Sequence, residues 1–207
     1  MSKFEKIRLS KMVENLLSSV LNVPELVKLN SWHQRKQSVE KTNTKNFAIL
    51  APVPEHHLIS GLDAITHQLD DDSLDTHPML AFGSNAFEAF GQADSLRKER
   101  MADVYIYASH TDDPPLNPQA TWKATYIKQV HSRRGRYPGK ASHRPETTTT
   151  DKPTWAIFWL IKDLEKLKKP LPIGDLKALG KKSNYSPRFL PEGPVLIEHP
   201  MVRRRLT

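Results

Sequence analysis

Hydrophobic and polar positions along the chain follow two periods, and each period predicts one type of element. Between Lys3 and Leu29 apolar residues recur at spacings of three and four, which predicts one or two amphipathic helices interrupted at Pro24. Over residues 104–109 apolar and polar positions alternate, and a second β-rich run covers residues 121–130. These two runs predict the arms of a hairpin with a long connecting loop.

The remaining apolar runs are short and are bounded by Pro, Gly or polar residues. Further strands are predicted at residues 47–53, 153–161 and 195–198. Helices are predicted after a cap at Ser60, after the break at Gly83 and, as a short piece, over residues 175–179. This mixture of strands and helices predicts the α+β class.

Shifts in composition divide the chain into three parts. Residues 1–45 predict a helical extension followed by a polar linker, residues 46–200 the main domain, and residues 201–207 a basic tail. The N-terminal helix either packs on the main domain or contacts a partner protein, and the sequence leaves both open. Residues 132–151 form a polar stretch of a length that is uncommon inside a compact domain. We interpret that stretch as an arm that becomes ordered on nucleic acid.

The net charge of +8 is unevenly distributed. Residues 46–122 hold three Lys or Arg against twelve Asp or Glu, whereas residues 123–207 hold nineteen against seven. A cationic excess that is concentrated in one part of a chain favours a polyanionic partner for that part. DNA and RNA both fit this requirement.

Several classes of protein are disfavoured by composition. The chain has no Cys, which excludes disulfides, thiolate chemistry and Cys-containing zinc sites. His56, His57 and His67 lack the spacing of a metalloprotease helix, so we expect no metal and no cofactor. The N-terminus lacks the pattern of a signal peptide, and no window approaches the roughly 18 apolar residues of a membrane span. We expect a soluble, cytoplasmic protein that does not bind membranes.

The predicted hairpin carries the candidate chemistry. Tyr105, Tyr107 and Ser109 share one face of its first strand, and its second strand leads into Arg133, Arg134 and Arg136. Aromatic rings stack on bases and guanidinium groups neutralise phosphates, so this combination is typical of a nucleic-acid site. We therefore predict a non-catalytic nucleic-acid-binding protein.

Two other functions are compatible with the same residues. A nuclease or related hydrolase would use His and Asp around the hairpin as acid and base, namely His110, Asp112, Asp113 and His131. An assembly subunit would instead use the basic loop to bind an acidic partner protein. No nucleophile elbow or metal-spaced His pair supports an enzyme, so we assign no catalytic residue.

Three segments carry a family resemblance. They are Ala102–Ser109 (ADVYIYAS), Pro153–Trp155 (PTW) and Lys169–Lys177 (KPLPIGDLK). In this order, after a first strand that begins at Phe47, they resemble the EVE domains of the PUA-like superfamily. The resemblance covers about residues 46–199.

This resemblance implies a small, strongly bent mixed β-barrel flanked by helices, with a pocket for a flipped and often modified base. The residues that it implies for the base pocket are Phe47, Tyr107, Ser109 and Trp155. Extruding a base costs a few kcal/mol, and stacking on a ring returns about 1–3 kcal/mol per base. The cations expected to hold the nucleic-acid backbone are Lys128, Arg133, Arg134, Arg136, Lys140, Arg144 and Arg188.

Overall fold

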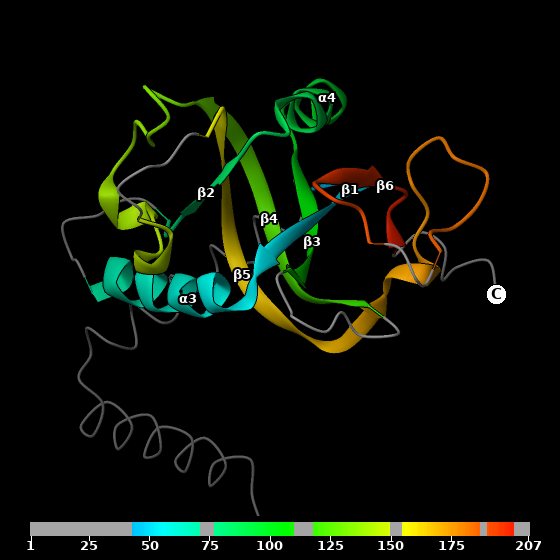
Figure 1. Ribbon diagram of the computed structural model, residues 1–207, viewed down its shortest axis with the longest axis horizontal. Helices are drawn as coiled ribbons and strands as arrows, with labels where there is room; N and C mark the ends of the chain where they lie inside the picture. The colour runs from blue at the N-terminus through cyan, green and yellow to red at the C-terminus, as the bar shows by residue number, and fades with distance from the viewer. Residues whose placement is uncertain (1–42, 71–76, 110–117, 150–154, 187–189, 201–207) are drawn as a thin grey trace, which may run out of the picture. The chain divides into compact units, whose positions relative to one another are not determined.

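The computed structural model describes residues 43–70, 77–109, 118–149, 155–186 and 190–200 (Figure 1). The chain divides into two units, Met1–Thr42 and Asn43–Thr207, and all described residues belong to the second unit. The helices predicted between Lys3 and Leu29 and the basic tail after Pro200 lie outside the described residues.

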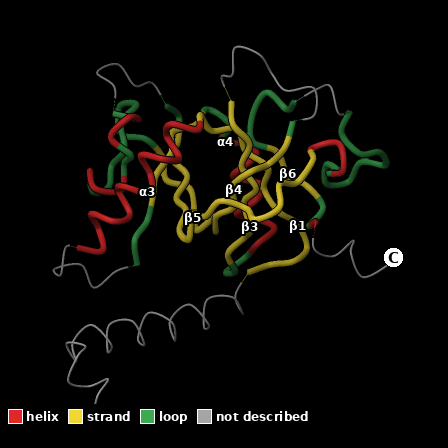
Figure 2. The backbone as a smooth tube through the Cα atoms, turned by 90° about the horizontal axis from the view of Figure 1, so that it is seen from below, coloured by secondary structure: helices red, strands yellow, loops and turns green. Residues whose placement is uncertain are grey.

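The described part of the chain is α+β, as the sequence predicts. Its strands form one sheet in the order β2-β5-β4-β3-β1-β6. The strands are β1 (Asn43–Pro54), β2 (Leu80–Ser84), β3 (Met101–Ser109), β4 (Gln119–His131), β5 (Ile157–Pro172) and β6 (Val195–Ile197). The helices are α3 (Glu55–Asp70) and α4 (Phe87–Arg97), and in Figures 1 and 2 α3 lies near β5 and away from β6.

The sheet is mixed and bent. β1 and β3 are parallel, β3 and β4 form the predicted long-looped hairpin, and β6 pairs antiparallel with β1. Figure 1 shows β4 and β5 as long, curved ribbons side by side, and their register shifts three times along their length. Such irregularities bend a sheet because an extra residue on one strand increases the local twist. Within the described residues the edge strands β2 and β6 do not pair, so the sheet is open.

Apolar side chains pack on both faces of this sheet. One core cluster joins the strands to the helices, and its members include Leu58 of α3 and Phe90 of α4. The opposite cluster contains Tyr105, Tyr107 and Leu176 and lies under the segment that follows β5. The alternation along β3 therefore separates two buried faces, because successive strand residues point to opposite sides.

Three elements differ from the sequence prediction. β2 was not predicted, because Gly83 interrupts a short apolar run that has no clear period. β5 continues to Pro172 through a polar stretch, and Asp163, which lies at one of the register shifts between β4 and β5, has a φ of 53°. The helix predicted over residues 175–179 is instead a single 3₁₀ turn, Ile173–Asp175.

The first residues of the two helices are Glu55 and Phe87. α3 begins at Glu55, so Ser60 does not cap it; the Ser60 hydroxyl accepts a hydrogen bond from the Thr147 amide at 3.4 Å. The start of α4 has no side-chain cap, and Phe87 at its first position is exposed. Phe90, three residues later, is the buried aromatic of this helix.

Candidate functional site

A cavity of about 800 Å³ lies where the sheet fails to close. Residues from edge strand β2 line one side, and residues from the end of β1 line the other. The segment that leads into β6 and the segment between β4 and β5 complete the wall. This volume falls in the range of small-molecule and cofactor pockets.

Trp155 provides the exposed aromatic surface of the cavity. It is 38% exposed, and its indole lies against Gly83 so closely that a Cβ at residue 83 would be 2.3 Å from the Trp155 Cδ1. The next amide, that of Ala156, donates a hydrogen bond to the Asn85 Oδ1 at 3.0 Å. Glycine at this strand position therefore lets a tryptophan ring lie on the main chain, and the amide contact with Asn85 holds the adjoining backbone in place.

Buried rings lie behind Trp155. Trp159 of β5 also lines the cavity but is 2% exposed. Its ring is stacked on Phe90 with a centroid distance of 5.2 Å and lies 5.4 Å from Phe82. Rings packed in this way are fixed by their neighbours. The cavity therefore has a rigid aromatic floor and one partly exposed ring.

The polar groups of the cavity are mostly uncharged. Hydroxyl groups come from the end of β3, from β2 and from the 3₁₀ turn Glu146–Thr148, namely Ser109, Ser84, Thr147 and Thr148. His57 Nδ1 and Thr147 Oγ1 are hydrogen bonded at 2.8 Å, which connects the start of α3 to that turn. Groups of this kind can donate to or accept from the edge of a planar ligand.

Arg144 is the cation of the cavity wall. Its guanidinium donates hydrogen bonds to the main-chain oxygens of Ala81 at 3.0 Å and Thr148 at 2.7 Å, and it lies 4.8 Å from the centroid of the Phe158 ring. Burial lowers the pKa of Arg144 to about 10, although the neighbouring Tyr137 acts in the opposite direction. The side chain therefore remains charged at neutral pH.

The segment that contains Arg144 is folded, which contradicts the predicted arm. Tyr137 and Arg144 both lie on Phe158, and the Tyr137 hydroxyl is hydrogen bonded to His143 Nδ1 at 3.0 Å. Burial, with the charge of Lys140, lowers the pKa of His143, so its imidazole is neutral at pH 7. An aromatic residue on the outer face of β5 thus organises residues that a sequence reading takes as an unstructured loop.

A tight turn presents the arginines that follow β4. Arg133 and Arg136 exchange main-chain hydrogen bonds of 2.8 and 3.1 Å, and Arg134 and Gly135 between them have φ values of 53° and 76°. Two positive φ values are the signature of a type I′ hairpin turn. The three arginine side chains at residues 133, 134 and 136 are exposed around this turn.

The structure brings together two of the four residues predicted for the base pocket. Ser109 and Trp155 both line the cavity. Phe47 is in the core and does not, because it faces the helices from the inner side of β1. Tyr107 is also buried; its hydroxyl donates to the main-chain oxygen of Pro191, so it positions the segment that lines the cavity at Glu192. Burial raises the pKa of the Tyr107 hydroxyl, and Tyr185 adds to this effect.

The predicted phosphate-binding cations fall into two groups. Five of them have exposed side chains, which a phosphate group can reach from solvent. They are Lys128, Arg133, Arg134, Arg136 and Lys140. Arg144 differs because it lies in the cavity wall, and Arg188 lies outside the described residues. Sequence reasoning missed Gly83 and Asn85, although a lone Gly inside an apolar run is a known signal of close approach to a strand.

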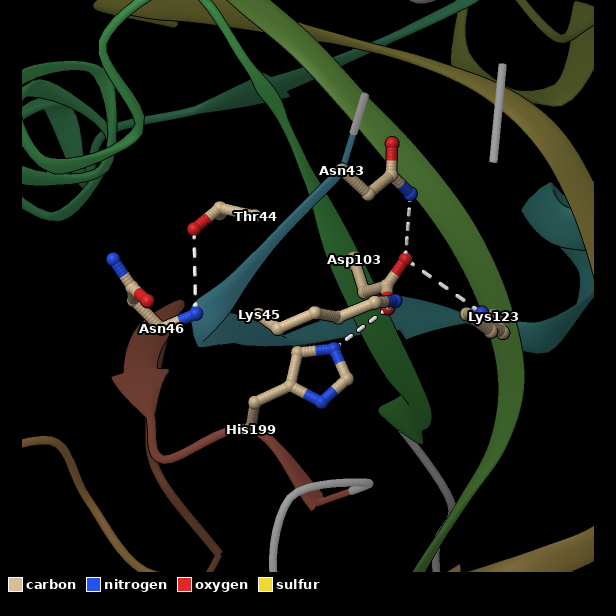
Figure 3. A network of polar contacts seen from close by, with 7 residues as sticks. All are labelled: Asn43, Thr44, Lys45, Asn46, Asp103, Lys123 and His199. Carbon is tan, nitrogen blue, oxygen red and sulfur yellow. Dashed lines mark hydrogen bonds and ion pairs between the residues drawn. The ribbon is translucent and has the colours of Figure 1, made fainter. Parts of the chain in front are cut away.

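A second polar cluster lies at the start of β3, around the carboxylate of Asp103 (Figure 3). Asp103 is 1% exposed; it accepts hydrogen bonds from Asn43 Nδ2 at 2.8 Å and Lys45 Nζ at 3.1 Å, and it contacts His199 Nε2 at 2.7 Å. Lys123 Nζ lies 3.6 Å away. Burial alone would raise the pKa of Asp103, but these partners, His199 first, hold it well below its ordinary value.

Three of the four residues proposed for a nuclease cannot be placed. His110, Asp112 and Asp113 lie outside the described residues, and His131 is exposed at the end of β4. Among the described residues no group of three His, Asp or Glu side chains could hold a metal ion. In the same part of the chain, no helix has the length and apolar character needed to cross a membrane.

No family model matches this chain, and no curated protein matches it either.

Proposed function

We propose that this protein is a non-catalytic nucleic-acid-binding protein with a PUA/EVE-like domain, and that the cavity at the open side of its sheet accepts one unstacked base. In this proposal the bent sheet corresponds to the barrel of that superfamily, and the gap between its unpaired edges β2 and β6 is the entrance for the base. The target is a DNA or RNA strand with a base that is flipped out, single-stranded or modified.

One observation carries the proposal: Trp155 is a partly exposed ring that is held in place at the wall of a cavity. One face of the indole lies on Gly83, and a hydroxyl group of Ser109 lines the same cavity. Stacking of a base on such a ring is worth about 1–3 kcal/mol, which is comparable with the few kcal/mol needed to unstack the base. A preformed ring, hydroxyl groups and an apolar floor match what a planar heterocycle requires.

The exposed arginine turn supports the same function. Arg133, Arg134 and Arg136 extend from the end of β4, and the segment that follows them contributes Arg144, Thr147 and Thr148 to the cavity wall. One continuous segment therefore carries the turn and contributes part of the cavity wall. Phosphate contacts at the turn would supply affinity without sequence preference, while contacts in the cavity would discriminate.

The test is fluorescence anisotropy with short labelled single strands that differ at one central position, which carries either a base or an abasic site. The wild-type protein should bind the intact strand more tightly than the abasic strand, since only the former can stack on Trp155. Trp155→Ala should lower affinity for the intact strand about tenfold and abolish the difference between the strands. Affinity should also fall steeply between roughly 50 and 200 mM salt.

Phe87→Ala is a matched control, because Phe87 is an exposed aromatic residue of α4 that does not line the cavity. It should bind both strands as the wild type does. Equal binding of intact and abasic strands by the wild type, or unchanged binding by Trp155→Ala, would refute the role of the cavity.

A further inference from the structure

Within the described residues Arg144 contacts neutral groups. Its two hydrogen bonds end on main-chain carbonyls, and its third contact is the ring of Phe158. Among the described residues no carboxylate forms an ion pair with it; Glu192, the carboxylate of the cavity lining, is exposed. A cation in the wall of a largely apolar cavity has a strong preference for an acceptor or an anion, because low polarity strengthens the interaction.

Arg144 also retains hydrogen-bonding capacity. A guanidinium has five N–H donors in a fixed planar arrangement, and the contacts to Ala81 and Thr148 use two of them. Those same contacts restrain the orientation of the group, since Ala81 belongs to edge strand β2 and Thr148 to the 3₁₀ turn. A planar donor that is fixed in this way can discriminate between ring edges, because paired acceptors match it and amino groups do not.

We propose that Arg144 is the specificity-determining residue of the cavity and selects a base whose inward edge carries hydrogen-bond acceptors. This inference rests on the proposed function. Guanine is a natural base with such an edge, since its O6 and N7 are adjacent acceptors, whereas adenine has an amino donor beside N7. A backbone phosphate would offer the same oxygen chemistry to Arg144, so the test must separate the two sources.

The experiment compares three otherwise identical single strands, with guanine, adenine or an abasic site at the central position. For the wild-type protein we expect guanine to bind about tenfold or more tightly than adenine, and adenine more tightly than the abasic strand. Arg144→Gln should bind the guanine and adenine strands equally while still preferring both to the abasic strand. Arg144→Lys keeps the charge but lacks the planar donor pair, so it should also lose the preference for guanine.

The outcomes are distinguishable. If the wild type binds guanine and adenine equally and the abasic strand more weakly, the role of Arg144 is refuted and the proposed function stands. If Arg144→Gln weakens binding of all three strands by the same factor, Arg144 contacts phosphate and the selection of a base edge is refuted. If the wild type binds all three strands equally, the base-binding cavity itself is refuted. Arg144 also donates a hydrogen bond to the main chain of β2, so the thermal stability of both variants is measured with the titrations. The comparison of guanine with adenine in the wild type does not depend on a variant.

Discussion

Asp103 is a buried charged side chain and Arg144 a partly buried one, and the domain surrounds them differently. Asp103 meets two lysines, an imidazole and an amide, whereas Arg144 meets two main-chain carbonyls and the face of Phe158. A buried charge that is surrounded by opposite partners contributes to the folded structure, and removal of one partner lowers the free energy of unfolding. A charge with only neutral partners in a cavity wall can still bind a ligand. The contrast separates a structural cluster from a candidate binding site.

The two tryptophans of the cavity show the same contrast among aromatic side chains. Trp159 is stacked between other rings and is 2% exposed, so its surface is used by the core. Trp155 has one face on Gly83 and is 38% exposed. Burial of a ring stabilises the fold, whereas a fixed and partly exposed ring offers stacking surface to a ligand.

The largest expected effect is on the structural side of this comparison. Asp103→Ala leaves the partners of a buried carboxylate without their acceptor and should lower the free energy of unfolding by about 3–5 kcal/mol. Urea denaturation followed by circular dichroism measures this. Asp63→Ala, at an exposed position of α3, is the control and should change stability by no more than about 0.5 kcal/mol. If Asp103→Ala changed the stability as little as Asp63→Ala, the surroundings of Asp103 would not differ from those of Arg144 in their contribution to folding.

The same cluster predicts a pH dependence. The folded protein holds the pKa of Asp103 below its ordinary value of 3.8, so below that pH the unfolded chain takes up the proton first. The contribution of Asp103 to stability is therefore complete above pH 3.8 and is lost as pH falls toward the folded pKa, at up to about 1.4 kcal/mol per pH unit. Urea denaturation of the wild type and Asp103→Asn over this range gives the difference. Parallel curves would contradict the assigned role of the carboxylate.

Much of the scaffold can be predicted from the sequence, whereas little of the difference between the surroundings of Asp103 and Arg144 can. The β3–β4 hairpin follows from the alternation over residues 104–109 and the β-rich run after it, and β6 follows from a short apolar run. The α+β class follows from the mixture of these strands with helices. β2 and the second half of β5 could not be predicted, because tertiary pairing holds a Gly-containing run and a Lys-rich run as strands.

The site was predictable only in part. Of the four residues predicted for a base pocket, Ser109 and Trp155 line the cavity. Phe47 and Tyr107 do not, since a pattern of alternation does not say which of two buried faces borders a cavity. Asp103 has a weak signal in the sequence, as a lone carboxylate within an apolar strand. Nothing in the sequence shows that Arg144 has no acidic partner among the residues that the structure describes.

Among the predictions on binding, Gly83→Ala tests whether binding requires Trp155 in its present position, because the variant keeps Trp155 and displaces its ring. The added methyl group would overlap the indole, so the ring must move away from its place on β2. We expect a shift in tryptophan fluorescence and about a tenfold loss of affinity for an intact strand, because the stacking surface is displaced. Gly91→Ala is the matched control, since a Cβ there meets only the Gln129 side chain at 3.7 Å. A variant Gly83→Ala that binds normally would show that the orientation of Trp155 is irrelevant.

The smallest effect concerns the exposed arginine turn. Replacing Arg133 and Arg136 by Gln and Arg134 by Asn removes three charges, and Asn tolerates the positive φ at residue 134. Affinity should fall by the same factor for intact and abasic strands, and the slope of log affinity against log salt should become less steep by about 0.7 for each lost phosphate contact. A change in the preference for the intact strand would place base recognition at the turn instead of the cavity.

The central claim, that a base enters the cavity beside Trp155, is tested most directly by photocrosslinking. A single strand with 5-iodouracil at its central position is irradiated with the wild-type protein, and the crosslinked peptide is identified by mass spectrometry. We predict a crosslink to Trp155, and its loss in the presence of excess unlabelled strand. A crosslink confined to the turn at residues 133–136, with none at residues that line the cavity, would contradict the claim.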